Sequence, residues 1–412
     1  MLSTLKGLYF SDTGKDTIIV FASSAINVLA AGIFFMLSVR ILGPANYGLF
    51  ATVVATGLLV VRLTNIGIDT GILRFASKGS ASNNAVLSLA LKSYLMLGAL
   101  VAVIGFVLSP HIAIFLKQPQ ITNLLRISLG ATVFFHLTNL FVAGLQANHQ
   151  FVKSYIPLIS NNLIRIVLIL LGAYFFTIGL LQLTIIYFSV TIASSVIGKL
   201  LFPIRLQKTE KQLASDFFKF NIWIGLALTI SAISFDNYFL LKLTGPIQTG
   251  LYAAPFKILN FVYEFGSSFT RVLASRFSSF DSNQKAIKFS QKAFAFPILL
   301  ACGMVFLIIL AKPVTQLVLG SEYLESVQIL RILSVGFIFF FLSTVPSSII
   351  LYYLGKSSVS FFITLVKYTL FALLLWMLVP TQKAQGAAIS FTIAEIVSLL
   401  LMSAYSFYKV RK

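Results

Sequence analysis

The chain contains a long internal repeat. Residues 43–51 read GPANYGLFA and residues 245–253 read GPIQTGLYA, so two similar segments stand 202 positions apart in a chain of 412 residues. The order continues along the chain, because the triplet LRI at 125–127 recurs at 330–332 and the pair KS at 153–154 recurs at 356–357. A period of about half the chain predicts two copies of one structural unit, with only short insertions between them.

Composition places both copies in a membrane. Hydrophobic residues make up 58% of the chain and charged residues 10%, whereas soluble domains have roughly 45–50% and 25%. A helix that crosses a bilayer needs about 20 predominantly apolar residues. Twelve stretches meet this requirement, six in each copy: residues 17–39, 47–66, 84–108, 122–145, 155–176, 179–198, 220–243, 249–270, 293–311, 326–351, 358–380 and 384–408.

The spans define the expected architecture. An even number of spans gives both copies the same orientation, so we expect them to be related by an axis along the membrane normal. We predict an all-α polytopic membrane protein with 12 transmembrane helices in two pseudo-symmetric six-helix lobes. The N-terminal lobe is residues 1–203, a cytoplasmic linker is residues 204–219, and the C-terminal lobe is residues 220–412. The linker composition fits both a helix on the membrane surface and a solvated connection.

The chain has a net charge of +20, and its basic residues are distributed unequally between the two sides of the membrane. With the N-terminus in the cytoplasm, most of the 31 Lys and Arg residues fall on the cytoplasmic side, as the positive-inside rule requires. This distribution predicts cytoplasmic N- and C-termini and membrane lipids as partners of the inner charges. It does not support binding to nucleic acid.

Several kinds of chemistry have no candidate residues. The single cysteine, Cys302, excludes an internal disulfide. The histidines His111, His136 and His149 are too dispersed to predict a metal site. No Gly-rich nucleotide-binding loop occurs, and neither does the acidic motif of a membrane glycosyltransferase. We therefore expect a transporter without a cofactor rather than an enzyme.

The repeated segment predicts a tight turn in each copy. A Gly-Pro pair ends one helix, and a second glycine lets the next helix begin in a hairpin on the outer side of the membrane. The turn residues are Gly43, Pro44 and Gly48 in the first copy and Gly245, Pro246 and Gly250 in the second.

Ionisable residues in or beside the predicted spans are functional candidates, because an unpaired charge in a bilayer costs several kcal/mol. The repeat offset of 202 aligns Arg62 with Glu264 and Asp69 with Arg271, so equivalent positions carry opposite charges. We hypothesise that Arg62 with Glu264, and Asp69 with Arg271, meet across the pseudo-twofold axis as a cytoplasmic gate. The alternative is that each charge snorkels to the surface or pairs locally.

A second acid and base flank the second turn. Asp236 and Lys257 lie at nearly equal distances from it, so adjacent antiparallel helices would bring them together. The equivalent residues of the first copy, Phe34 and Ala55, are apolar. The duplication itself therefore does not require these charges, and asymmetry of this kind is usual where a site has specialised.

Cations outnumber acids within the spans. Lys92, Arg165 and Lys367 add positive charge in spans 3, 5 and 11, against Glu395 in span 12. A cavity with that balance attracts an anionic solute, and arginine matches phosphate oxygens with two parallel donors. The candidate cavity residues are Arg62, Lys257, Glu264, Asp236, Arg165 and Lys92.

Four segments carry a family resemblance: VRILGPANYGLFA at 39–51, GIDTGILRFAS at 67–77, FDNYFLLKLTGPIQTGLYAAPFKI at 235–258 and GAAISFTIAE at 386–395. Together they resemble the polysaccharide transporter family, the O-antigen and lipid-linked oligosaccharide flippases of the multidrug/oligosaccharidyl-lipid/polysaccharide (MOP) exporter superfamily. The resemblance implies a two-lobed carrier in the bacterial inner membrane, with a central cavity lined largely by helices 1, 2, 7 and 8. Lys92, Arg165 and Lys367 then fall on more peripheral helices.

The resemblance also implies a substrate. It would be an undecaprenyl-diphosphate-linked oligosaccharide, moved from the cytoplasmic to the periplasmic leaflet by alternating access, with other polysaccharide assembly proteins as partners. A diphosphate and a polar sugar chain cannot cross hydrocarbon unaided, so a cationic passage fits this substrate. Coupling to H+ or Na+ through Glu264 or Asp236 is a separate hypothesis.

Three other functions compete with this interpretation. The alternative is a multidrug exporter of the same superfamily, which would place uncompensated carboxylates in its cavity. A major-facilitator carrier also has two six-helix halves, but the basic residues expected after its loop motif are missing at 67–71. A membrane enzyme of glycan assembly would form product from a sugar nucleotide.

Overall fold

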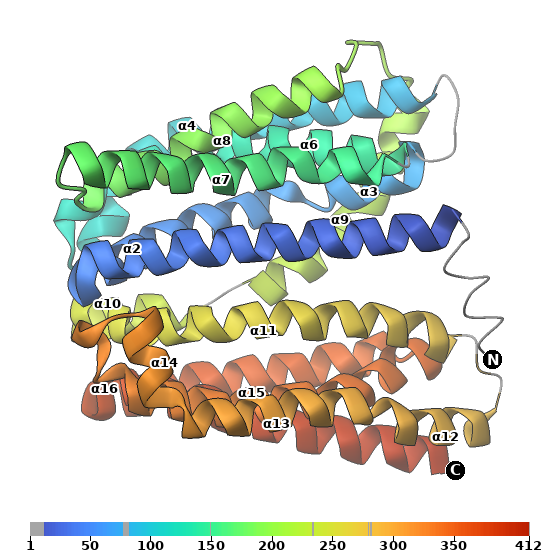
Figure 1. The fold of residues 1–412 in the computed structure, drawn as a ribbon. Coiled ribbons are helices and arrows are strands. Elements are labelled where there is room, and N and C mark those ends of the chain that lie inside the picture. The colour runs from blue at the N-terminus through green and yellow to red at the C-terminus, as the bar shows by residue number, and fades with distance from the viewer. Residues whose placement is uncertain are drawn as a thin grey trace. The chain divides into compact units, whose positions relative to one another are not determined.

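The computed structural model describes residues 12–76, 82–148, 150–232, 235–278, 280 and 282–411. Every regular element in these ranges is a helix, as the sequence predicts (Figure 1). Eight helical stretches among the described residues are long and apolar enough to cross a membrane. A helix of this kind satisfies its own backbone hydrogen bonds, which lipid cannot do. The chain is therefore an integral membrane protein, and the count of twelve spans stays a prediction.

Two of the eight stretches are each a pair of helices joined at a kink. The helix α2, Asp12–Asn65, is interrupted at Gly43, where φ is 64° and ψ is 174°. The helix α16, Ser357–Arg411, is interrupted at Lys383, where φ is 51° and ψ is −131°. A positive φ ends helical geometry in an L-residue chain, so the chain reverses direction at both positions.

Contacts divide the chain into two compact units. The N-terminal unit comprises Met1–Ile41 and Phe50–Ser234, and the C-terminal unit comprises Leu42–Leu49 and Phe235–Lys412. This grouping by contacts differs from a division by repeat, because the turn of the first copy belongs to the C-terminal unit and α9 to the N-terminal unit. Besides most of α2, the N-terminal unit contains α3 (Ile68–Ala76), α4 (Ser82–Phe115), η1 (Pro119–Ile121), α5 (Thr122–Gly130), α6 (Thr132–Ala147), α7 (Phe151–Phe175), α8 (Leu180–Leu201) and α9 (Lys211–Ala232).

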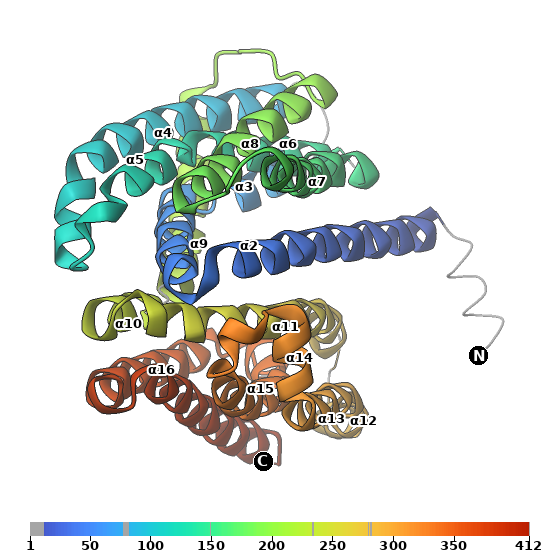
Figure 2. The same ribbon diagram turned by 60° about the vertical axis from the view of Figure 1, so that its left-hand side comes forward.

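In the N-terminal unit the short helix α3 packs against α4, α6 and α9. The long helices α4, α6, α7 and α8 lie side by side (Figures 1 and 2). A hydrophobic core joins α3, α4, α6 and α9. It includes the fully buried residues Ile72, Tyr94, Leu140 and Phe217, one from each helix. Close packing of these side chains stabilises the contacts of α3 with α4, α6 and α9.

The first part of the predicted linker forms no helix, and its second part belongs to α9. Residues 202–210 form no helix, and α9 begins at Lys211. The Ser88 hydroxyl on α4 donates to the carbonyl of Gln207 and accepts a bond from its backbone N–H, both at 2.9 Å, while Thr209 donates to the Ala85 carbonyl. These bonds attach the connection to the start of α4.

The C-terminal unit is built around α15 and α16. Its elements, besides α16 and the turn at Leu42–Leu49, are α10 (Asp236–Thr244), α11 (Pro246–Ser278), α12 (Asn283–Ala293), α13 (Ala295–Ile309), α14 (Ala311–Val318), η2 (Ser321–Tyr323), α15 (Ser326–Ser348) and the π-helical turn η3 (Ile349–Tyr353). The helix α15 packs against α11, α13 and α16, so its residues include many of the buried ones (Figure 2).

Details of local structure recur at the repeat spacing. Gly43 and Gly245 both have positive φ, and η1 and η2 occur at equivalent places. The two copies therefore share backbone geometry as well as sequence.

Candidate functional site

The two predicted turns touch each other within the C-terminal unit. A Cβ atom on Gly48 would overlap the carbonyl oxygen of Pro246, and a Cβ on Gly250 would overlap the carbonyl oxygen of Pro44. The contact is reciprocal, since each glycine faces the other copy's proline. Glycine is thus required at both positions because backbone approaches backbone without room for a side chain. The sequence predicted two hairpins, and the structure adds that they pack together.

Arg165 is a buried cation on α7 of the N-terminal unit. Its Nε and Nη2 donate to the backbone carbonyl of Tyr187 on α8, at 3.1 and 2.7 Å. The guanidinium lies 3.9 Å from the centre of the Tyr187 ring and 5.7 Å from that of Phe34 on α2. The ring of Phe50 also meets Tyr187 edge-on. Arg165 is therefore held by aromatic faces and a carbonyl.

None of these partners carries a negative charge. Within the part of the chain that the structure describes, no carboxylate lies within ion-pair distance of Arg165, although its side chain is only 6% exposed. A guanidinium remains charged in proteins. The contacts with Tyr187 and Phe34 reduce the cost of burial through the electron-rich ring faces, but the full positive charge remains.

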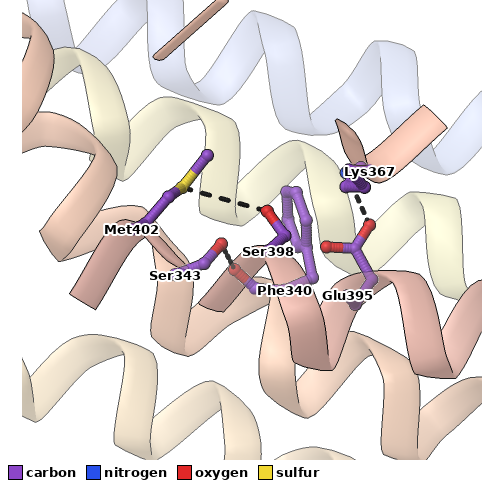
Figure 3. A network of polar contacts seen from close by, with 6 residues as sticks. All are labelled: Phe340, Ser343, Lys367, Glu395, Ser398 and Met402. Carbon is purple, nitrogen blue, oxygen red and sulfur yellow. Dashed lines mark hydrogen bonds and ion pairs between the residues drawn. The ribbon is translucent and has the colours of Figure 1, made fainter. Parts of the chain in front are cut away.

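The C-terminal unit holds a cation close to the corresponding place. Lys367 on α16 lies 202 residues after Arg165, which is the spacing of the two turns and one residue less than the spacing of the nearby KS pairs. Its Nζ forms an ion pair with Oε1 of Glu395 at 2.7 Å (Figure 3). Glu395 is 3% exposed, and its second oxygen, Oε2, is buried without a hydrogen-bond partner. Here an acid offsets a cation whose side chain is 18% exposed.

Asp69 on α3, a predicted gate residue, lies in a local hydrogen-bond network. The Tyr94 hydroxyl donates to Oδ1 and the Asn65 amide donates to Oδ2, both at 2.6 Å. Burial raises the pKa of the Asp69 carboxyl above its ordinary value, and the two hydrogen bonds oppose part of that rise. The side chain of Arg271, its predicted partner, lies outside the described residues, so the pairing stays a prediction.

Asp236 begins α10 and is buried in the C-terminal unit. Its Oδ2 accepts a hydrogen bond from the hydroxyl of Tyr252 on α11 at 2.9 Å, and its Oδ1 accepts one from the backbone of Asn237. Tyr252 is fully buried. The network joins the two helices that flank the second turn, so it fixes the hairpin. The predicted pairing of Asp236 with Lys257 stays a prediction.

The remaining predicted cavity residues are less buried. Arg62, Lys92 and Lys257 are exposed to the surroundings of the protein. Lys92 donates to the Gln207 carbonyl of the connection between α8 and α9, at 3.1 Å. The Glu264 side chain lies outside the described residues, so the predicted meeting of Arg62 with Glu264 stays a hypothesis. Among the described residues no group of three His, Cys, Asp or Glu side chains is placed to hold a metal ion.

The sequence interpretation missed two features. The first is the equivalence of Arg165 and Lys367, which the repeat offset of 202 would have revealed. The second is the pairing of Asp69 with Tyr94, which no local pattern indicates because 25 residues separate them. The i,i+4 spacing of Asn65 and Asp69 was the available signal for part of this network.

Comparison with protein families gives one match over most of the chain. The family model described as polysaccharide biosynthesis protein matches residues 37–328. The matched segment contains both GP turns, Arg165 and the Asp69 network. It extends over far more than half of the chain.

Two named proteins are similar in sequence. A capsular polysaccharide biosynthesis protein, CapF, of Staphylococcus aureus is 27% identical over 172 residues, which is 41% of this chain and 43% of that protein. A putative O-antigen transporter of Shigella flexneri is 26% identical over 199 residues, which is 47% of this chain and 46% of that protein. The chain thus matches less than half the length of each relative.

Solved structures with the same fold are transporters of the MOP superfamily and a lipid flippase. An inward-facing multidrug resistance MATE family transporter superposes with a TM-score of 0.78 at 12% identity, covering 95% of this chain and 98% of that one. The lipid II flippase MurJ in an inward closed conformation superposes with a TM-score of 0.75 at 17% identity, covering 96% and 89%. At these identities the likeness shows a common MATE-like fold.

Proposed function

The chain belongs to the polysaccharide biosynthesis protein family, and from this premise we propose that it is a flippase for a lipid-linked oligosaccharide. The substrate is an undecaprenyl-diphosphate-linked repeat unit of O-antigen or another surface polysaccharide. It passes from the cytoplasmic to the periplasmic leaflet of the bacterial inner membrane by alternating access. The observation that carries this proposal is the family match over residues 37–328.

The buried charge of the N-terminal unit supports an anionic substrate. Arg165 contacts a carbonyl and aromatic rings, so its positive charge is not offset by a carboxylate among the described residues. A diphosphate is a strong ligand for a guanidinium in a medium of low dielectric constant, because two parallel N–H donors match two oxygens. Arg62, Lys257 and Lys92 are the other cations of the proposed cationic cavity, and Asp236 and Glu264 its acids.

The proposal can be tested in proteoliposomes that contain the purified protein. A labelled undecaprenyl-diphosphate glycan is added to one leaflet, and its arrival in the other is detected by a membrane-impermeant reagent specific for the sugar. We expect wild-type protein to accelerate transfer and Arg165→Gln to reduce it by about tenfold or more, as expected for loss of a charged hydrogen-bonding partner. Lys199→Gln is the matched control, because Lys199 is an exposed cation on α8.

Two results would contradict the flippase. Transfer equal to that of protein-free vesicles excludes this substrate, and transport of cationic amphiphiles by the same preparation would instead support a multidrug exporter. Formation of glycan product from a sugar nucleotide would indicate an enzyme.

The topology is tested separately. We propose twelve spans with both termini in the cytoplasm. Cys302 is the single cysteine and is exposed, so Cys302→Ala provides a cysteine-free background. Single cysteines placed at Thr209 in the connection and at Gln118 beside η1 should then react with impermeant maleimide from opposite sides of intact cells. Reaction of both from the same side would contradict the proposed topology.

A further inference from the structure

Asn161 is a buried amide on α7, one helical turn before Arg165. The buried residues of α7 follow one stripe along the helix: Ser154, Pro157, Asn161, Arg165 and Ile169. The exposed apolar residues Leu163 and Val167 lie on the opposite face. A spacing of four residues makes Asn161 and Arg165 neighbours on one helix face. Asn161 is only 8% exposed, so its amide lies inside the N-terminal unit and does not face lipid.

This amide has no hydrogen-bond partner among the described residues. Its Oδ1 is buried and unpaired, and its Nδ2 donates to none of them. The adjacent Asn162, by contrast, donates to Oδ1 of Asn27 on α2 at 2.9 Å. Most buried polar side-chain atoms in proteins are paired, so each exception needs an explanation. The contrast between the two neighbouring asparagines indicates that Asn161 serves something other than the packing of α7.

Arg165 and Thr191 also have unused hydrogen-bond donors. Nε and Nη2 of Arg165 donate to the Tyr187 carbonyl, and Nη2 also donates to the Thr191 hydroxyl oxygen on α8 at 3.5 Å. Nη1 of Arg165 and the buried hydroxyl of Thr191 donate to none of the residues that the structure describes. Asn161, Arg165 and Thr191, which we call the donor cluster, therefore combine one positive charge with unused donors on every side chain.

The donor cluster fits a phosphate group. A phosphate is an anion with several strong acceptor oxygens, so it matches a site in which donors surround a positive charge. Its oxygens are arranged tetrahedrally, so one phosphate can accept hydrogen bonds from α7 and α8 at once. A carboxylate fits less well. Its two oxygens lie in one plane and pair best with one edge of a guanidinium, and the edge formed by Nε and Nη2 of Arg165 is occupied by the Tyr187 carbonyl.

The donor cluster lies near the middle of a candidate membrane span. The helix Phe151–Phe175 is long and apolar enough to cross the bilayer. At 1.5 Å per residue, Asn161 lies about 15 Å and Arg165 about 21 Å from the start of this helix. An unpaired charge is most costly at this depth in a bilayer. Donors that the protein supplies here therefore have their largest effect on the passage of a phosphate.

The second copy has no amide at this place. Asn161 corresponds to Ile363 at the offset of 202, and to Thr364 at the offset of 203 that the KS pairs show. Both copies share their helical architecture, so that architecture does not depend on an amide here. The Asn161 amide is thus a specialised feature of the first copy.

We propose that Asn161, Arg165 and Thr191 form a phosphate-binding site in the N-terminal unit, with Asn161 and Thr191 as phosphate ligands beside the Arg165 guanidinium. The inference rests on the proposed flippase function, because there the phosphate belongs to the lipid-linked glycan and is bound part of the way through the membrane. Arg165 supplies the charge through its free Nη1, and Asn161 and Thr191 orient the phosphate by hydrogen bonds.

Binding is tested with the full-length protein in lipid nanodiscs and radiolabelled farnesyl diphosphate, a short polyprenyl diphosphate without sugar. Nanodiscs without protein give the background. We expect saturable binding by wild-type protein, which unlabelled farnesol does not displace. Displacement by inorganic pyrophosphate identifies a site that recognises the free anion, and displacement by unlabelled farnesyl diphosphate alone identifies a site that needs the lipid as well. Both results support recognition of phosphate.

The first variant is Asn161→Leu, which keeps the approximate size of the side chain and removes its donor. We expect its affinity for farnesyl diphosphate to fall about tenfold or more, as for loss of a hydrogen bond to a charged group. Its unfolding temperature should stay equal or rise, because an unpaired buried amide is removed. Asn162→Leu is the matched control. It breaks the bond to Asn27, so it should lower the unfolding temperature and leave the affinity at the wild-type value.

The second variant, Asn161→Asp, adds a counter-charge beside Arg165. An aspartate four residues before an arginine on one helix face pairs with it, so the acid takes the place of the phosphate at Nη1. We expect a higher unfolding temperature and loss of farnesyl diphosphate binding. This variant tests the site even if Asn161→Leu does not fold.

Several results would overturn the site. Absence of binding by wild-type protein, or displacement of the probe by farnesol, would show that phosphate is not recognised. An affinity of Asn161→Leu equal to that of wild type, or retained binding in Asn161→Asp, would remove Asn161 from the site. Displacement by glucuronate, a carboxylate anion, at the concentration at which pyrophosphate displaces the probe would contradict the assignment to phosphate.

The glycan-transfer assay separates this site from the proposed function. Per folded protein, we expect Asn161→Leu to slow transfer and Asn162→Leu to leave it near wild type. Transfer by Asn161→Leu at the wild-type rate would overturn the role of the site in transfer. Absence of transfer in every sample contradicts the proposed flippase, and the binding of farnesyl diphosphate then still decides whether the phosphate site exists.

Discussion

Arg165 and Lys367 lie within one residue of equivalent positions in the two copies, yet the two units stabilise these cations in different ways. Arg165 in the N-terminal unit donates to a backbone carbonyl and lies against aromatic rings. Lys367 in the C-terminal unit is paired with Glu395 at 2.7 Å. One fold thus accommodates a cation between its fifth and sixth helices either with neutral partners or with an acid.

The residues at equivalent positions on the helices around each turn also differ between the two units. In the N-terminal unit Phe34 and Phe50 contact the Tyr187 ring that covers Arg165. At the offset of 202 the C-terminal unit has Asp236 and Tyr252, which are joined by a hydrogen bond. The N-terminal unit therefore has aromatic rings at the two positions where the C-terminal unit has an acid hydrogen-bonded to a tyrosine.

This difference separates structural from functional charge. Lys367 and Glu395 offset each other, so the pair is a structural element that needs no ligand. Arg165 has no such counter-charge among the described residues, and it is the cation that an anionic substrate would find unpaired. Under the proposed function, Arg165 is therefore a better candidate than Lys367 for contact with an anionic substrate.

The largest expected effect comes from removing the acid of the C-terminal pair. Glu395→Gln leaves the partly buried Lys367 beside a neutral amide, and breaking an ion pair on one side costs about 3–5 kcal/mol when both partners are fully buried. We expect the free energy of unfolding to fall by at most this amount, measured by denaturant titration in detergent micelles. The double variant Lys367→Met with Glu395→Met removes both charges and should recover most of the loss. A stability equal to wild type in Glu395→Gln would show that the pair does not hold α16 together.

The next effect concerns the feature that both copies share. Gly48→Ala and Gly250→Ala each place a methyl group against a proline carbonyl of the other turn. Overpacking of this kind costs about 1–3 kcal/mol or more, so both variants should unfold at lower temperature and lose glycan transfer. Gly303→Ala is the matched control, since nothing lies within 4 Å of a Cβ at that helical position. Equal stability of Gly48→Ala and Gly303→Ala would contradict the close packing of the turns.

The sequence predicted the repeated elements better than the partners of their charges. The motifs around Gly43 and Gly245 were enough to predict both turns, because glycine and proline restrict backbone geometry directly. The acceptor of Arg165 is a backbone carbonyl, which every residue possesses, so no pattern could identify it. Asp69 illustrates the same limit. The repeat offset predicted Arg271 as its partner, but it could not indicate the neutral donors Asn65 and Tyr94 that the structure shows.

A smaller loss of stability is expected when a cation is exchanged for one of the same charge and a different shape. Arg165→Lys keeps the charge but loses the two parallel donors to the Tyr187 carbonyl, at a cost of about 1–2 kcal/mol. Lys367→Arg keeps an ion pair with Glu395 and should cost less. We expect glycan transfer to fall in Arg165→Lys and to remain near wild type in Lys367→Arg. Equal losses of transfer in the two variants would remove the functional distinction between the units.

The smallest effect concerns Asp69, the acid of the N-terminal unit whose donors are neutral. Burial raises the pKa of its carboxyl above the ordinary value of 3.8, so the folded protein holds this proton more tightly than the unfolded chain does. The contribution of Asp69 to stability is therefore complete below about pH 3.8 and is lost as the pH rises through the folded value. Asp69→Asn cannot ionise, so its unfolding temperature should decline less between acidic and neutral pH. Asp216→Asn is the control, because Asp216 is an exposed acid of α9 in the same unit. If the unfolding temperatures of the two variants depend on pH in the same way, ionisation of Asp69 is not linked to folding. Burial of this carboxyl would then have no measurable effect on the stability of the N-terminal unit.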